Sequence, residues 1–216
     1  MLKSMRASLV QKVLANKYPE PTTHLNANSA WQLLIAVILS AQCTDARVNL
    51  VTPQLFSLWP DVYSLAKAQS LDVEKVIRST GFFRNKAKNI ISASKRIIQV
   101  YDGNVPNKLV DLITLAGVAR KTANVVLWES FGINEGIAVD THVGRISFRL
   151  GLTESTSPIQ VEKDLMLLFP RKEWGNVNHR MVWFGRQVCD AKKPLCTTCE
   201  MEEFCPRVPW NSTHKV

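Results

Sequence analysis

Between two stretches of helical periodicity the chain reads Leu115-Ala116-Gly117-Val118-Ala119-Arg120-Lys121-Thr122-Ala123. Gly117 permits a tight turn, and we expect the second helix to begin near Ala119. The first backbone N–H groups of a helix have no partner within it, so this turn presents donors that suit a phosphate group. The segment predicts two helices joined by a hairpin turn, although a basic helix–turn–helix fits the same residues.

Lys121 falls in the first turn of that second helix. The positive end of the helix dipole disfavours an ammonium ion there and favours a neutral amine. A neutral amine at this position can attack a sugar carbon and form a Schiff base. The simpler interpretation is a solvated lysine at the start of a helix.

Asp140 follows nineteen residues later, in the stretch Gly136-Ile137-Ala138-Val139-Asp140-Thr141-His142-Val143-Gly144-Arg145. An aspartate here suits the N-cap of a helix over residues 141–150. It also suits the stabilisation of positive charge while a glycosidic bond breaks, and the two roles are compatible. His142 and Arg145 either contact a phosphate or satisfy local polar groups.

Helical periodicity extends over most of the chain, and no useful stretch alternates with the period of a strand. The clearest helix spans residues 84–101, with an apolar face from which Lys86 is excluded and with Gly103 at its end. Asp72 is predicted to cap a short helix, and Pro106 to lie in the first turn of another. The predicted helices are 30–42, 72–79, 84–101, 106–113, 120–131, 141–150, 159–169 and 175–188.

Four of the five cysteines crowd into one segment with the spacing C-x6-C-x2-C-x5-C: Cys189, Cys196, Cys199 and Cys205. Four thiolates on one loop suit an iron–sulfur cluster, and a tetrahedral zinc site remains the alternative. Lys192 and Lys193, between the first two cysteines, would be held where they can meet phosphates. We expect Cys43, which stands apart, to be a small buried side chain. The odd number and close spacing are atypical of a disulfide scaffold and indicate a reducing compartment.

The chain is strongly basic, since 27 Lys and Arg residues outnumber 18 Asp and Glu residues and give a net charge of +9. Such an excess favours nucleic acid or an anionic membrane surface as partner. The longest apolar run, residues 31–41, is too short to span a bilayer.

Taken in order, the motifs resemble those of the endonuclease III family of DNA glycosylase/AP lyases over Ser29 to Pro206. The motifs are the hairpin ending in Lys121-Thr122-Ala123, the cysteine loop, and the stretches Leu39-Ser40-Ala41-Gln42-Cys43-Thr44-Asp45 and Val139-Asp140-Thr141-His142. The resemblance implies an all-α, two-lobed helix-hairpin-helix fold with a six-helix barrel and an iron–sulfur lobe. The expected parts are an N-terminal helix of the cluster lobe (1–21), the barrel with the hairpin (22–135), C-terminal helices with the cysteine loop (136–206) and a tail (207–216).

The resemblance also implies roles for individual residues. Lys121 matches the family's nucleophile and Asp140 its catalytic carboxylate, while Cys189, Cys196, Cys199 and Cys205 match the ligands of a [4Fe–4S] cluster. Gln42 matches a residue that enters the gap left by an extruded base. Phe82 matches a wedge residue, although a core position is the alternative.

The hairpin, with Gly117, Ala119 and Arg120, is expected to bind the DNA backbone. The family's hairpin commonly reads Leu-Pro-Gly-Val-Gly, whereas this chain has Ala116 and Ala119 at the second and fifth positions. The methyl group of Ala119 lies where the backbone must approach a phosphate, so we expect weaker phosphate binding.

The implied activity is excision of oxidised pyrimidines from duplex DNA, followed by cleavage at the abasic site. We expect a monomer without a membrane segment, located in the cytoplasm or, in a prokaryote, at the nucleoid. Two alternatives stay open. One is a relative of the adenine-mismatch glycosylases, against which Lys121 argues. The other is a non-catalytic iron–sulfur module that only binds DNA.

Overall fold

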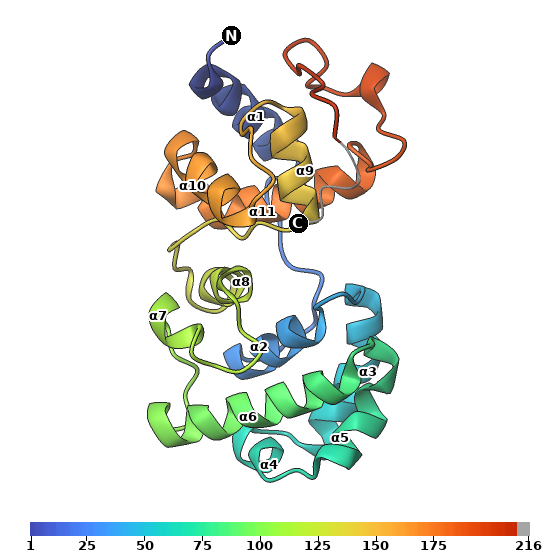
Figure 1. Cartoon of the computed structure of the whole chain (residues 1–216), viewed down its shortest axis with the longest axis vertical. Helices are drawn as coiled ribbons and strands as arrows, with labels where there is room; N and C mark the ends of the chain where they lie inside the picture. The colour runs from blue at the N-terminus through green and yellow to red at the C-terminus, as the bar shows by residue number, and fades with distance from the viewer. Residues whose placement is uncertain (211–216) are drawn as a thin grey trace. The chain divides into compact units, whose positions relative to one another are not determined.

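The computed structural model describes residues 1–210, and over this range it consists of helices and loops without a strand. The all-α prediction is therefore confirmed. The chain divides into two compact units (Figure 1). The hairpin unit comprises His24–Ile133, and the cysteine unit comprises Met1–Thr23 together with the chain from Asn134 onward.

Within the hairpin unit, α2 forms the centre of the core. Ser29 caps its first turn by accepting a hydrogen bond from the Gln32 backbone N–H, and eight of its ten residues are buried. The helix ends at Leu39, three residues before the predicted end. The helices of this unit are α2 (Ala30–Leu39), α3 (Asp45–Leu58), α4 (Val62–Ala66), α5 (Ser70–Ile77), α6 (Phe83–Tyr101), α7 (Leu109–Leu112) and α8 (Arg120–Phe131).

The long helix α6 packs against α2, α4 and α5 within this unit (Figure 1). Its apolar positions recur at helical spacing, and Ala87, Ile90 and Ile97 are fully buried. The prediction for Lys86 was wrong, because this side chain is buried and only 4% exposed. Its ammonium donates a hydrogen bond to the Thr80 carbonyl, which satisfies part of its polarity inside the protein.

Other helices of this unit also differ from the predictions. Asp72 lies inside the first turn of α5 rather than at its cap, which is Gln69. Pro106 precedes α7, which begins only at Leu109. The helices α3 and α4 were not predicted, and α3 continues through Pro53, a residue that is unfavourable inside a helix.

The cysteine unit is built from α1 (Lys3–Lys17), α9 (Thr141–Arg149), α10 (Pro158–Leu168) and α11 (Trp174–Gln187). Helix α11 packs against both α1 and α9, so the N-terminal helix shares a core with helices from the other end of the chain. Gly151, with a φ of 60°, follows the end of α9. Cys189, Cys199 and Cys205 pack against this core as partly buried side chains.

The segment after Pro206 was predicted as a tail, and its first four residues instead pack on the cysteine unit. The Val208 N–H donates to the Arg149 carbonyl at 3.1 Å. Trp210 makes an edge contact with Phe148, with ring centroids 5.5 Å apart. Residues 211–216 of that predicted tail lie outside the described residues.

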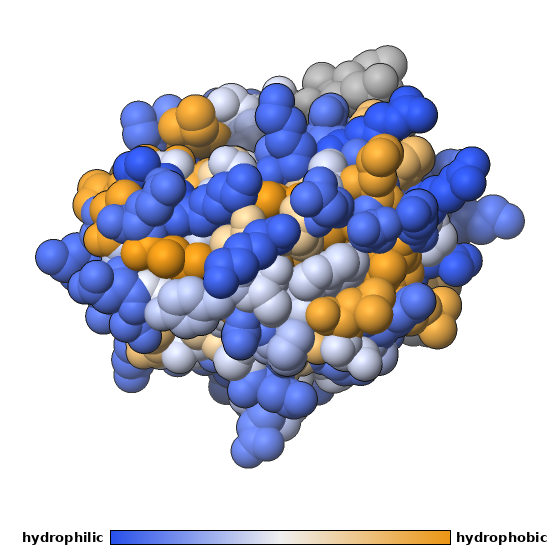
Figure 2. All heavy atoms as spheres, turned by 90° about the horizontal axis from the view of Figure 1, so that it is seen from below, coloured by the Kyte–Doolittle hydropathy of each residue, from blue (hydrophilic) through white to orange (hydrophobic). Residues whose placement is uncertain are grey.

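On the face seen in Figure 2, toward α4, hydrophobic side chains lie among more numerous hydrophilic ones. The exposed large hydrophobics of the hairpin unit come from different helices, among them Leu58, Tyr63 and Leu71. Such scattered residues are ordinary on a protein surface. Among the described residues, no helix has both the length and the apolar character needed to cross a membrane.

Candidate functional site

The predicted hairpin turn is present in the structure. Gly117 has a φ of 79°, and the Val118 N–H donates to the Leu115 carbonyl at 3.1 Å. Helix α8 begins at Arg120, and its N-cap Ala119 is extended with a φ of −89° and forms no side-chain cap. The first N–H groups of α8 are thus left to other partners. Because φ at Ala119 is negative, alanine fits this backbone without strain.

Lys121 lies in the first turn of α8 and is exposed. The helix behind it is firmly anchored, because the five consecutive residues from Ala123 to Leu127 are buried. An anchored helix therefore carries an exposed lysine beside the positive end of its own dipole.

Asp140 is the N-cap of α9, as predicted. Its Oδ1 accepts hydrogen bonds from the backbone N–H groups of His142 and Val143, both at 2.9 Å. Both bonds reach the same oxygen, so capping leaves Oδ2 available for a chemical role. Asp140 belongs to the cysteine unit, whereas Lys121 belongs to the hairpin unit.

His142 and Arg145 satisfy local polar groups, which was one of the two roles left open by the sequence. Arg145 is 5% exposed, and its guanidinium donates to the Gly185 and Cys189 carbonyls at 3.2 and 3.0 Å. Its Nη2 lies 3.2 Å from Nδ1 of His142. Burial lowers the pKa of His142, which favours the neutral ring that accepts this hydrogen bond.

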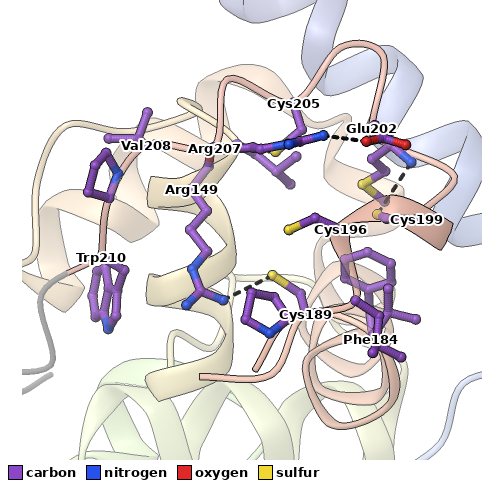
Figure 3. Close-up of a pocket in the computed structure, with 16 residues that line it drawn as sticks. Arg149, Phe184, Cys189, Cys196, Cys199, Glu202, Cys205, Arg207, Val208 and Trp210 are labelled. Atoms are coloured by element: carbon purple, nitrogen blue, oxygen red, sulfur yellow. Dashed lines mark hydrogen bonds and ion pairs between the residues drawn. The ribbon is translucent and has the colours of Figure 1, made fainter. Parts of the chain in front are cut away.

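The four clustered cysteines line a single cavity of about 190 Å³ in the cysteine unit. Figure 3 shows Cys189, Cys196, Cys199 and Cys205 around this cavity, with Arg149 beside Cys189. Burial raises the pKa of the Cys199 and Cys205 thiols, and neighbouring cysteines of the same loop act in the same direction. Four thiolates gathered around one cavity would repel one another unless a cation compensated their charge.

Hydrogen-bond donors surround this sulfur-rich cavity. The Met201 N–H donates to the Cys199 sulfur, and Nη1 of Arg149 to the Cys189 sulfur, both at 3.4 Å. Arg149 also donates to the carbonyls of Asp190 and Ala191, at 2.6 and 2.8 Å. Helix α9 thus holds the beginning of the cysteine loop.

Lys192 and Lys193 are exposed, and their backbone is held by Asp190. The Asp190 Oδ1 accepts both of their N–H groups, at 2.8 and 2.9 Å. These hydrogen bonds lower the pKa of Asp190, so the carboxylate form prevails at neutral pH. The loop therefore presents two lysines on an ordered turn.

Gln42 and Phe82 lie in turns of the hairpin unit, and both have left-handed backbone angles, with φ of 52° and 47°. Phe82 is 65% exposed, so its alternative assignment to the core was wrong. Gln42 is also exposed. Cys43 is only partly buried and lies beyond the end of α2, which corrects its predicted full burial.

Sequence reasoning missed Arg149, Asp190 and Lys86. The sequence did offer a signal for Asp190. An aspartate side chain commonly accepts hydrogen bonds from the backbone N–H groups two and three residues later, and these bonds form such a turn. Arg149 and Lys86 depend on contacts with other segments of the chain, for which a local pattern offers no signal.

Comparison with known proteins agrees with these features. Residues 35–171 match the family described as HhH-GPD superfamily base excision DNA repair protein. Endonuclease III of Synechocystis sp. is 52% identical over 204 residues, covering 94% of this chain and 93% of the relative. Endonuclease III of Bacillus subtilis is 43% identical, covering 89% and 88%.

A solved structure agrees as well. It contains a trapped endonuclease III–DNA covalent intermediate with an estranged adenine, and it matches with a TM-score of 0.91 and 41% identity. The match covers 96% of this chain and 97% of the solved one. The chain therefore belongs to the HhH-GPD superfamily of base excision DNA repair proteins, and within it to the endonuclease III family.

Proposed function

We propose that this protein is a bifunctional DNA glycosylase/AP lyase that removes oxidised or ring-saturated pyrimidines from duplex DNA. The observation that carries the proposal is the position of Lys121, exposed in the first turn of α8 directly after the hairpin turn. In the related endonuclease III, a covalent complex with DNA has been trapped. A lysine amine is the group expected to form such a bond with a sugar.

In the proposed reaction, Nζ of Lys121 forms a bond to C1′ of the deoxyribose while the bond from C1′ to the base breaks. The base departs with the bonding electrons and gains a proton. Asp140 accepts the proton of the attacking amine, directly or through water, and stabilises the positive charge that develops on the sugar. The sugar ring then opens: the C1′–O4′ bond breaks, O4′ takes up a proton, and C1′ and Nζ form the imine. The imine acidifies the C2′ proton, whose removal expels the 3′ phosphate as the C3′–O bond breaks, and the strand is cut.

The base must leave the stack before this reaction, and damage weakens its stacking. We assign Gln42 to the gap left by the extruded base and Phe82 to the wedge beside it. A phenyl ring that is 65% exposed can stack on the unpaired base of the opposite strand.

Backbone contacts would come from the N–H groups of the hairpin, with Gly117, Ala119 and Arg120, and from Lys192 and Lys193 on the cysteine loop. His142 remains a candidate for a phosphate contact. We assign no DNA contact to Arg145, because its guanidinium is buried and donates hydrogen bonds to carbonyl groups. We propose that the protein acts as a monomer in the cytoplasm, at the nucleoid in a prokaryote, on duplex DNA with a damaged base or an abasic site.

We propose that the cysteine cavity holds a [4Fe–4S] cluster rather than a single zinc ion. Four cysteines around a cavity of about 190 Å³ leave room for a polynuclear cluster. Cys189, Cys196, Cys199 and Cys205 would hold it, and when bound it would anchor the loop that carries Lys192 and Lys193.

Replacing Cys196 with serine is expected to reduce the iron bound per protein by about tenfold or more, since one of four thiolate ligands is lost. Helix content of the hairpin unit should persist. Iron analysis and circular dichroism check both points. Cys43→Ser is the control, because Cys43 lies outside the loop, and it should bind iron like the unaltered protein. Zinc in place of iron in the unaltered protein would contradict the assignment.

Replacing Gly117 with alanine is expected to lower the free energy of unfolding by about 1–3 kcal/mol and to weaken DNA binding. Its φ is 79°, and an added Cβ would lie 3.0 Å from both Cβ and Nδ2 of Asn89. The control is Gly132→Ala at the other end of α8. There φ is 65° and no atom lies within 4 Å of the added Cβ. Urea unfolding and binding to a duplex with an abasic analogue are measured for both variants. An equal loss of DNA binding in Gly117→Ala and Gly132→Ala would exclude a special role for the hairpin turn.

The proposed function is tested by incubating the cluster-loaded protein with duplexes that each carry one lesion, with and without borohydride. We expect incision at oxidised pyrimidines and abasic sites, and a covalent protein–DNA product when borohydride is present. Binding without incision would favour the non-catalytic module. Release of adenine from mismatches would favour the adenine-mismatch glycosylases.

A further inference from the structure

The turn that carries Phe82 has an unusual backbone. Gly81 and Phe82 both have positive φ angles, 69° and 47°. Glycine adopts this region readily, whereas phenylalanine is strained there. Such a conformation persists only where the surroundings hold it.

Side-chain packing contributes little at Gly81 and Phe82 themselves. No atom lies within 4 Å of a Cβ placed on Gly81, and the Phe82 side chain is 65% exposed. The direction of the phenyl ring is therefore set by the backbone rather than by neighbouring side chains.

Lys86 binds both ends of the same turn. Its Nζ donates to the Thr80 carbonyl at 2.7 Å, and its backbone N–H donates to the Phe82 carbonyl at 3.1 Å. Thr80 is itself fixed, since it is buried and its hydroxyl donates to the Ile77 carbonyl at 2.8 Å. One residue thus closes the segment from Thr80 to Phe82.

The burial of Lys86 calls for a physical reason, because lysine is rarely buried. Burial lowers its pKa, and Cys43, the neighbour of Gln42, opposes this effect. A charged donor makes a stronger hydrogen bond to a carbonyl than a neutral one does.

We propose that Lys86 is a positioning residue for base extrusion, which holds the turn of residues 80–82 so that the Phe82 ring projects toward DNA. This inference rests on the proposed function, since it takes Phe82 to be the wedge. It adds a residue that does not touch DNA and acts through Phe82.

The test compares Lys86→Met, which keeps an apolar stem of similar length, with Lys86→Arg, which keeps a charged donor. Lys88→Met, an exposed lysine on the same helix, is the matched control. Each protein is bound to a duplex that holds an uncleavable abasic analogue opposite 2-aminopurine, whose fluorescence reports stacking by Phe82. Single-turnover release of an oxidised pyrimidine is measured in parallel.

We expect Lys86→Met to lose most of the fluorescence change and to release the base about tenfold more slowly. Lys86→Arg should recover most of both signals, and Lys88→Met should match the unaltered protein. In the Phe82→Ala background, Lys86→Met should add little, because both changes remove the same interaction.

Normal fluorescence with Lys86→Met, or full additivity with Phe82→Ala, would overturn the inference. Should Lys86→Met fail to fold, Lys86→Gln, which keeps a neutral donor, carries the same comparison. The fluorescence measurement requires only that the protein binds the duplex, not that it releases a base. If the unaltered protein released no base, the proposed function would fail while the role of Lys86 was still decided.

Discussion

Lys121→Ala protein is expected to form no borohydride-trapped product with abasic duplex and to release damaged bases at least about a thousandfold more slowly. The amine of Lys121 is the only group in the proposed reaction that bonds to the sugar. Without it, no covalent intermediate should form. Denaturing gel electrophoresis of the borohydride reaction measures the covalent product directly.

Lys121→Arg is the matched control for charge. Arginine keeps the positive charge at the start of α8, but its guanidinium stays protonated and forms no imine. We therefore expect DNA binding within about threefold of the unaltered protein and no trapped product, since a single charge contributes modestly to binding. Trapping by either variant would refute Lys121 as the nucleophile.

Asp140→Asn protein is expected to keep its stability and to lose about a thousandfold in the rate of base release. Asparagine is as good an N-cap as aspartate, so its side-chain oxygen can still accept from the N–H groups of His142 and Val143. It has no negative charge with which to stabilise the sugar or accept a proton. Single-turnover kinetics and urea unfolding measure the two effects separately.

Asp140→Ala completes the comparison, because it removes cap and charge together. It should lose as much activity as Asp140→Asn and in addition about 1 kcal/mol of stability. Base release by Asp140→Asn at nearly the normal rate would limit Asp140 to capping α9.

Local sequence patterns correctly predicted the helices whose bounds are set by their own residues. Helix α8 spans Arg120–Phe131, the predicted range, and α6 spans Phe83–Tyr101, one residue more than predicted. Both have a regular apolar face bounded by residues of clear turn or cap preference. Pro106 misled the prediction of α7, because proline also suits an extended segment before a helix.

The candidate site was predictable where a residue type has one dominant chemistry. Four closely spaced cysteines indicate a metal, and an aspartate before a helix indicates a cap. Lys86 was wrongly predicted to lie off the apolar face, because its burial depends on the turn at Thr80. The role of Arg145 was left undecided, because it depends on the loop at Cys189. The left-handed backbone of Phe82 was equally hidden, since phenylalanine has no preference for it.

The first helix of the chain packs with residues that lie far later in the sequence. Arg180 donates to the Tyr18 carbonyl at 3.0 Å, and Lys17 forms an ion pair with Glu200 at 2.5 Å. During translation, residues 24–133 emerge as one uninterrupted stretch and can fold while the ribosome is still working. Helix α1 cannot complete its packing until α10 and α11 have been synthesised. A nascent chain stalled before Pro158 would thus display a folded hairpin unit and an N-terminal helix whose apolar residues Ala7, Val10 and Leu14 still lack the cover of α10 and α11.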